Sequence, residues 1–89
     1  MVAELIQKEE IPNLTFNDKS TVNQHSDLQK QIEHATVLGN GHHSKVSIYF
    51  KDDSGEKKVE TTIWAYGSKF ICLKGGIWIP ISRVIEIKY

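Results

Sequence analysis

Hydrophobic residues recur at every second position in the second half of the chain. The run Lys45–Lys51 places Val, Ile and Phe at alternate positions, and the run Lys58–Tyr66 continues the pattern over a longer stretch. This spacing is typical of strands with one buried face. The length of the second run predicts a strand that bends.

Turn sequences separate the predicted strands, at residues 52–56, 67–68 and 75–76. Asp and Ser bond to their own backbone, and Gly accepts the positive φ of tight hairpins. Pro80 cannot donate to a central ladder and so marks a strand end. Residues 80–83 have the length of one helical turn before the last predicted strand.

Residues 26–38 show helical spacing instead. Ser26 is a suitable N-cap with Gln29 three residues later, which predicts a capping box, and Gly39–Gly41 predicts the helix end. The apolar stripe recurs at i, i+4 and i+7, at Leu28, Ile32 and Ala35.

Residues 1–25 keep no sustained period, and Pro12 disfavours helix before it. We therefore expect a flexible N-terminal tail over 1–25, with Leu14 and Phe16 packed onto the domain. A chain of 89 residues supplies one modest core. Residues 26–89 are predicted to form that single domain.

A helix followed by five strands, with a short helical turn before the last strand, is the element order of SH3-like and Sm-like small barrels. The predicted fold class is therefore mainly β (α+β), with an N-terminal helix followed by a five-stranded antiparallel SH3/Sm-like small barrel. Closure of such a barrel removes the exposed strand edges of a small sheet.

Three segments resemble a family of small bacterial proteins of unknown function. They read VETTIWA at Val59–Ala65, LKGG at Leu73–Gly76, and IPIxRVxE at Ile79–Glu86, and the helix followed by Gly-Asn-Gly is similar too. The resemblance covers about residues 26–89 and implies no activity. In architecture alone, a helix plus a small barrel is also similar to Rof-type proteins, which bind the Rho termination factor; no site residue is carried over from them.

The formal net charge is zero, but the charge is unevenly placed. Residues 1–44 carry three Lys against six acids, and residues 45–89 carry eight Lys or Arg against five acids. Cys72 is the single cysteine, which excludes an intramolecular disulfide and favours a reducing compartment. The N-terminus has no basic start and no long apolar run, so we expect a cytoplasmic protein.

Candidate chemistry is sparse. Zinc sites need closing ligand geometry, and no such spacing links the four histidines, His25, His34, His42 and His43. Gly39–Lys45 lacks the glycine and lysine spacing of a phosphate loop. Cys72 lies between apolar neighbours and has no identifiable base, so it reads as a small buried hydrophobe. We therefore expect no metal, no cofactor and no enzymatic activity.

Outward aromatic residues are the strongest lead. If the residues of 59–65 at odd positions face inward, Trp64 and Tyr66 face outward, and the same alternation turns Tyr49 and Trp78 outward. Such a patch marks an interaction surface, unless the helix stripe or the tail covers it. The candidate binding residues are Tyr49, Trp64, Tyr66, Trp78, Lys45, Lys51, Lys69 and Lys74.

These observations predict a non-enzymatic small-barrel binding module for a protein partner. A protein is favoured because a net charge of zero gives little phosphate neutralisation. The alternative is RNA or single-stranded nucleic-acid binding through the aromatic and lysine residues. Self-association stays open, and no membrane contact is expected.

Overall fold

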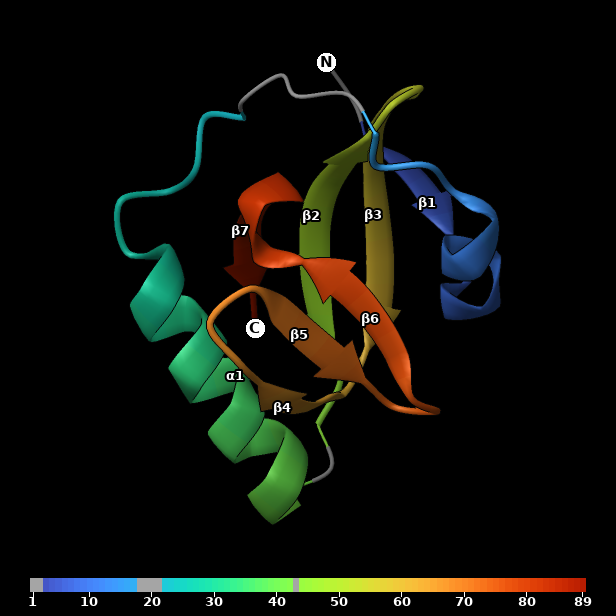
Figure 1. Cartoon of the computed structure of the whole chain (residues 1–89). Coiled ribbons are helices and arrows are strands. Elements are labelled where there is room, and N and C mark those ends of the chain that lie inside the picture. Colours follow the sequence, from blue (N-terminus) through green and yellow to red (C-terminus); the bar gives the residue numbers. More distant parts are fainter. Residues whose placement is uncertain (1–2, 18–21, 43) are drawn as a thin grey trace.

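The computed structural model describes residues 3–17, 22–42 and 44–89. These residues form two β-sheets, an α-helix and two 3-10 helices (Figure 1). The strands are β1 (Glu4–Ile6), β2 (Val46–Asp52), β3 (Gly55–Thr61), β4 (Ile63–Tyr66), β5 (Phe70–Leu73), β6 (Ile77–Pro80) and β7 (Val84–Lys88). The helical segments are the 3-10 helix η1 (Lys8–Asn13), the α-helix α1 (Leu28–His42) and the 3-10 helix η2 (Ile81–Arg83). The single helical turn expected before the last strand is thus η2.

One core lies between the two sheets. The first sheet has the order β1-β3-β2-β7, and the second has the order β4-β5-β6. Strand β1 pairs with β3 in parallel, and the other pairs are antiparallel. Apolar residues of both sheets and both longer helical segments share the buried cluster, which is Ile6, Ile11, Leu28, Ile32, Ala35, Val46, Ile48, Phe50, Val59, Ile63, Ile71, Leu73, Ile79, Val84 and Ile87.

The long alternating run at residues 58–66 divides between the two sheets. Strand β3 ends at Thr61 in the first sheet, and β4 begins at Ile63 in the second. Between them Thr62 is buried, and its carbonyl accepts a 2.9 Å hydrogen bond from the Lys74 amide. The predicted bend is therefore a transfer of the chain from one sheet to the other.

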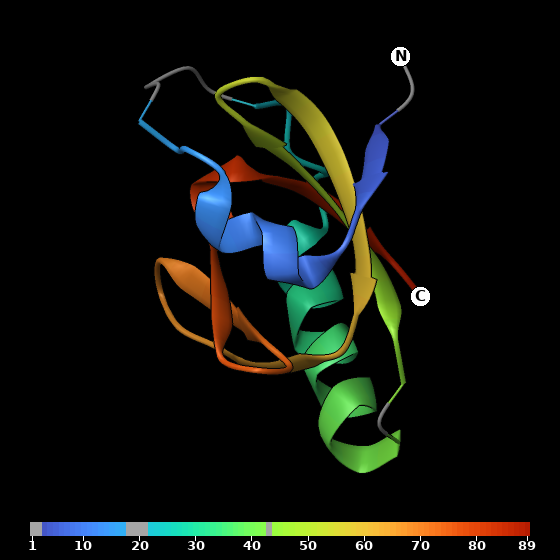
Figure 2. The same cartoon turned by 90° about the vertical axis from the view of Figure 1, so that its right-hand side faces the viewer.

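The predicted five-stranded SH3/Sm-like barrel with an N-terminal helix is wrong. Seven strands form two sheets in the described residues, and no ladder there joins the edge of one sheet to the edge of the other. Helix α1 contacts the edge strands β4 and β7, and η1 contacts β6 and β3 (Figure 2). Helical segments therefore occupy the two sides on which the edges of the sheets would have to pair to close a barrel. The helix itself lies in the middle of the chain, after β1 and η1.

Helix α1 buries the stripe that the sequence predicts, at Leu28, Ile32 and Ala35, and adds Gly39 to it. The helix continues through Gly39–Gly41 to His42, so the helix end predicted at these glycines is wrong. A Cβ built on Gly39 would lie 2.2 Å from the carbonyl oxygen of Ile63. Glycine stands at position 39 because the helix axis approaches β4 closely there.

Residues 3–17, within the range expected to be a flexible tail, are part of the domain. Strand β1 pairs with β3, and the side chains of Ile6 and Ile11 are buried in the core. Leu14 and Phe16 pack against the core, as the sequence led us to expect. Residues 1–2 and 18–21 of the predicted tail lie outside the described residues.

Helix α1 and the residues before it also bond to the outer edges of the sheets. The Gln31 side chain accepts a 3.0 Å hydrogen bond from the Ile87 amide, and the His25 amide donates to the Ile85 carbonyl at 2.8 Å. On the second sheet, the Asn40 side chain donates to the Trp64 carbonyl at 3.1 Å. Edge strands β7 and β4 are thereby capped by one helical segment. No helix among the described residues is long and apolar enough to cross a membrane.

Candidate functional site

The second sheet has one buried face and one exposed aromatic face. Side chains that face the core have an exposed fraction of 0%, and they are Ile63, Ile71, Leu73 and Ile79. The alternate positions expose large rings, with 45% exposure for Phe70 and 53% for Trp78. Period-two alternation along β5 and β6 produces this division.

Two of the exposed rings contact each other across the strands. Cys72 pairs with Trp78 and Phe70 pairs with Pro80, so Phe70 and Trp78 are diagonal neighbours on one face. Their ring centroids are 6.3 Å apart with an interplanar angle of 90°. This edge-to-face arrangement is a favoured geometry for aromatic pairs and holds both rings in place.

A register shift in β4 places Ala65 on the same face as the exposed Trp64. Ile63 pairs with the buried Leu73, but Ala65 pairs with Cys72, so the ladder is irregular at Trp64. An extra residue in one strand of a pair displaces the alternation that follows it. Ala65 is exposed as a result, although the undisturbed pattern predicts it to face inward.

The same shift separates Tyr66 from the other rings. Tyr66 pairs with the buried Ile71 and belongs to the opposite row, although its position at the end of β4 leaves it 40% exposed. We define the aromatic face as the outward row of the second sheet, which consists of Trp64, Ala65, Phe70, Cys72, Trp78 and Pro80.

The structure brings together half of the predicted binding residues. Trp64 and Trp78 lie on the aromatic face, and the exposed Lys69 and Lys74 stand at the two ends of β5. Phe70 was missed in the sequence, although Ile71 and Leu73 point inward by alternation and therefore turn Phe70 outward.

The remaining candidates lie elsewhere. Tyr49 and Lys51 are half-buried on β2 in the first sheet, and Lys45 is exposed just before that strand. The ammonium groups of Lys58 and Lys88 are each 5.5 Å from the centre of the Tyr49 ring. Tyr49 thus belongs to a charged surface on a different sheet.

The three strands of the second sheet carry no charged residue, and lysines stand in the turns at the two ends of β5. No Asp or Glu occurs between Glu60 and Glu86 in the sequence, whereas Lys69 and Lys74 are both exposed there. Two groups outside this stretch have shifted pKa values. A hydrogen bond from the Lys8 side chain lowers the pKa of Glu9, and a hydrogen bond with the Tyr49 side chain raises the pKa of Lys58. The charged residues between Glu60 and Glu86 are therefore all basic, although the formal net charge of the whole chain is zero.

A pocket of about 460 Å³ opens where the aromatic face ends at Phe70 and Pro80. Its lining residues come from the β4–β5 turn, the η2 region and the segment before α1, and they are Gln24, Ser68, Lys69, Phe70, Pro80, Ile81 and Ser82. The side-chain amide of Gln24 donates to the carbonyls of Ile81 and Val84 at 2.7 and 3.0 Å. These bonds fix one wall of the pocket.

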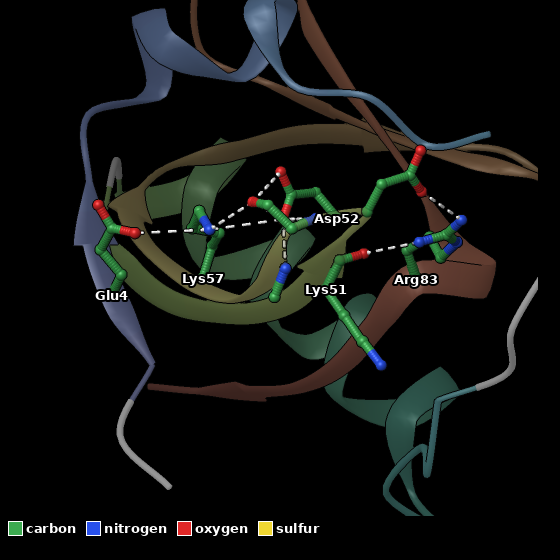
Figure 3. A network of polar contacts seen from close by, with 8 residues as sticks. Glu4, Lys51, Asp52, Lys57 and Arg83 are labelled. Carbon is green, nitrogen blue, oxygen red and sulfur yellow. Dashed lines mark hydrogen bonds and ion pairs between the residues drawn. The ribbon is translucent and has the colours of Figure 1, made fainter. Parts of the chain in front are cut away.

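A second notable feature is a pair of buried charges at the β2–β3 turn (Figure 3). Asp52 Oδ1 accepts hydrogen bonds from the Ser54 and Gly55 amides at 3.2 and 3.0 Å. The Lys57 ammonium lies 3.4 Å from this oxygen and 3.4 Å from Glu4 of β1. The cluster ties the hairpin to the N-terminal strand.

Arg83 extends this network on the other side. Its guanidinium donates to the Lys51 carbonyl at 3.2 Å and to Asp53 at 3.1 Å, and Asp53 accepts a 2.9 Å hydrogen bond from the Asn17 amide. These charged groups are bound by groups of the chain itself, which is the arrangement of a structural network. Within residues 3–17, 22–42 and 44–89, no group of three or more His, Cys, Asp or Glu side chains is placed to hold a metal ion. His43 lies outside that range.

No family model, no curated protein and no solved structure matches the chain. The resemblance to a bacterial family and the cytoplasmic location stay predictions. The aromatic face, its lysines and the adjoining pocket are the surface on which a function can be argued.

Proposed function

We propose that this chain is a non-enzymatic binding module that contacts a protein partner through the aromatic face. The observation that carries the proposal is the exposure of Trp64, Phe70 and Trp78 by 45%, 45% and 53% on a sheet whose other face buries Ile63, Ile71, Leu73 and Ile79 in the core. Contiguous exposed aromatic area on a small domain marks interaction surfaces. Aromatic residues are also enriched at the centres of protein interfaces.

The size of the face indicates a transient rather than a permanent contact. Three half-exposed rings present roughly 300 Å² of apolar surface, if a buried aromatic side chain covers about 200 Å². A standard interface takes about 800 Å² from each partner, so the face supplies its centre and needs a polar rim. At about 25 cal/mol per Å², burying this apolar surface contributes about 7 kcal/mol to binding. The entropic cost of association, several kcal/mol, reduces that contribution.

Single-stranded nucleic acid is the second candidate, favoured by the absence of Asp and Glu from the sequence between Glu60 and Glu86. Bases stack on exposed aromatic rings, and lysines hold the phosphates. Lys69 and Lys74 are the two cations that flank the face, and two neutralised phosphates give a slope of about −1.4 in log K against log salt. This electrostatic contribution is small, so we place a protein partner first.

Trp78→Ala is expected to weaken partner binding about tenfold, because truncating a central aromatic anchor typically costs more than 1 kcal/mol. Trp78 is half-exposed, and we expect the variant to stay folded with a loss of stability below about 1 kcal/mol. The measurement is quantitative recovery of proteins by wild-type and variant bait from cells that naturally express the chain. Titration of the purified partner, followed by tryptophan fluorescence, then gives the affinities.

Leu5→Ala is the matched control, because Leu5 is also a large apolar side chain with 58% exposure but lies on β1 in the first sheet. Its binding should equal that of the wild type. A partner that both variants retain, or that both lose, contradicts the assignment to the aromatic face. Sedimentation of the bait alone tests whether the recovered species is a second copy of the chain.

Oligonucleotide titration separates the second candidate from the first. If nucleic acid is the ligand, a single-stranded oligonucleotide will bind at low salt, Trp78→Ala will reduce that binding, and added salt will weaken it with the shallow slope of two phosphates. Our expectation for a protein-binding face is that no saturable binding occurs below millimolar oligonucleotide at 50 mM salt.

A further inference from the structure

We infer that the pocket at Phe70 and Pro80 is the anchor site of the aromatic face, and that it takes an apolar side chain from an acidic peptide segment of the partner. This inference rests on the proposed function and names the chemistry of the partner. Phe70 and Pro80 belong both to the aromatic face and to the pocket lining. A segment lying along the face therefore reaches the pocket without leaving the surface.

The pocket is built for an apolar group. Phe70, Pro80 and Ile81 supply its apolar surface, and its volume of about 460 Å³ falls in the range of ordinary ligand pockets. The Ile81 amide donates to the Lys69 carbonyl at 2.8 Å, which links η2 to the start of β5. Together with the two hydrogen bonds of Gln24, this bond preorganises the pocket and lowers the ordering cost of binding.

The rim of the pocket favours a negative charge beside the apolar group. Lys69 is exposed and lines the pocket together with Ser68 and Ser82. No acidic residue lines the pocket, and none occurs in the sequence between Glu60 and Glu86. A carboxylate next to the inserted side chain can therefore pair with Lys69 without facing a like charge.

Charge complementarity selects this occupant over the others. A second copy of the chain docked face to face would bring the same exposed lysines and no acid between Glu60 and Glu86, so the two lysine sets would repel. A basic or neutral segment would leave Lys69 without a counter-charge in the complex. An acidic segment of a protein with one aromatic or large aliphatic residue fits both the apolar floor and the cationic rim.

The test is an NMR titration of the full chain with the blocked peptide acetyl-Gly-Gly-Phe-Glu-Gly-amide. We expect saturable shifts of the backbone amides of Phe70, Ile81 and Ser82, with a dissociation constant on the order of 1 mM. Replacing Glu by Gln in the peptide should weaken binding about threefold, as expected for an exposed ion pair. Replacing Phe by Ala should abolish saturable shifts.

Lys69→Gln and Lys74→Gln form a matched pair, since both lysines are exposed at the ends of β5 and Lys69 alone lines the pocket. Lys69→Gln should weaken the Glu peptide about threefold and leave the Gln peptide unaffected, whereas Lys74→Gln should change neither. Equal effects of the two variants would overturn the inference. Chemical-shift changes confined to β4 would also overturn it. So would a result in which the blocked peptide does not bind but the same peptide with a free C-terminal carboxylate does.

The proposed function and the anchor site can fail independently of each other. If Trp78→Ala loses the natural partner while Lys69→Gln retains it and the blocked peptide does not bind, the aromatic face stands and the anchor site is refuted. If the peptide binds at the pocket as described but Trp78→Ala keeps the partner at full affinity, the pocket stands and the wider face does not.

Discussion

Gly39→Ala is expected to lower the free energy of unfolding by about 2–3 kcal/mol, although alanine is the better helix former. In the interior of a helix, exchanging Gly for Ala normally gains up to about 1 kcal/mol. At position 39 the added Cβ would lie 2.2 Å from the Ile63 carbonyl oxygen and 2.9 Å from the Thr62 side chain. The oxygen belongs to the β4 backbone, so helix α1 must withdraw from the strand, and such overpacking costs 1–3 kcal/mol or more.

Gly41→Ala is the control that isolates the close approach. Gly41 lies two residues further along the same helix, and a Cβ there would meet no atom within 4 Å. We expect it to leave stability unchanged or raise it by up to about 0.5 kcal/mol. Urea unfolding followed by circular dichroism measures both variants. If Gly39→Ala proves as stable as Gly41→Ala, helix α1 does not contact β4 as described.

Asp52→Ala is expected to cost about 3 kcal/mol of stability. The substitution removes the acceptor of the Ser54 and Gly55 amides and the 3.4 Å partner of the Lys57 ammonium. Asp52 and Lys57 have exposed fractions of 2% and 8%, so the groups left behind are poorly hydrated. An unsatisfied buried donor costs about 1–3 kcal/mol, and breaking a buried ion pair costs about 3–5 kcal/mol.

The value expected for Asp52→Ala is at the lower end because Lys57 keeps Glu4 at 3.4 Å and the Ser54 hydroxyl at 3.1 Å. Asp52→Asn retains an oxygen acceptor and should cost about 1 kcal/mol. Glu60→Ala removes the exposed carboxylate that pairs at 3.4 Å with Lys58 of the same strand, β3, and should change stability by less than about 0.5 kcal/mol. A cost for Asp52→Ala no larger than that for Glu60→Ala would refute the structural role of the buried pair.

The strands after Lys45 could be predicted because each has one side facing the core. Val46, Ile48 and Phe50 are buried as the alternation requires, and the turns at Asp53 and Gly75 fall where the local chemistry places them. The length of the run at residues 58–66 predicted a bend, but nothing in the sequence placed the transfer between sheets at Thr62, because Thr is an ordinary strand residue. Its position is set by the tertiary packing of β3 and β4.

Other features depend on contacts between distant parts of the chain. Gly39 is equally suited to end a helix and to approach a strand, and only the position of Ile63 decides between the two. Strand β1 has three residues, which is too short to show a period, and Ile6 is its one buried side chain. The pairing of Lys57 with Asp52 and Glu4 joins residues that have no spacing rule in common.

One local irregularity explains part of what the sequence analysis missed at the candidate site. The alternation correctly predicted that the side chains of Trp64 and Trp78 are exposed. The register shift beside Ala65 then reversed the rows, which removed Tyr66 from the aromatic face. A one-residue irregularity of this kind has no marker in the sequence, because the residues around it are ordinary strand formers.

Because Gln31 and Asn40 bond to the outer strands of two different sheets, helix α1 also protects the chain against aggregation. Open strand edges are templates for pairing with other molecules. Displacing the whole helix would uncover β4 and β7 together and leave two strand edges open to pairing, whereas opening near Asn40 alone would uncover only β4. Solubility at high concentration should therefore depend more on the docking of α1 than on the number of exposed apolar side chains.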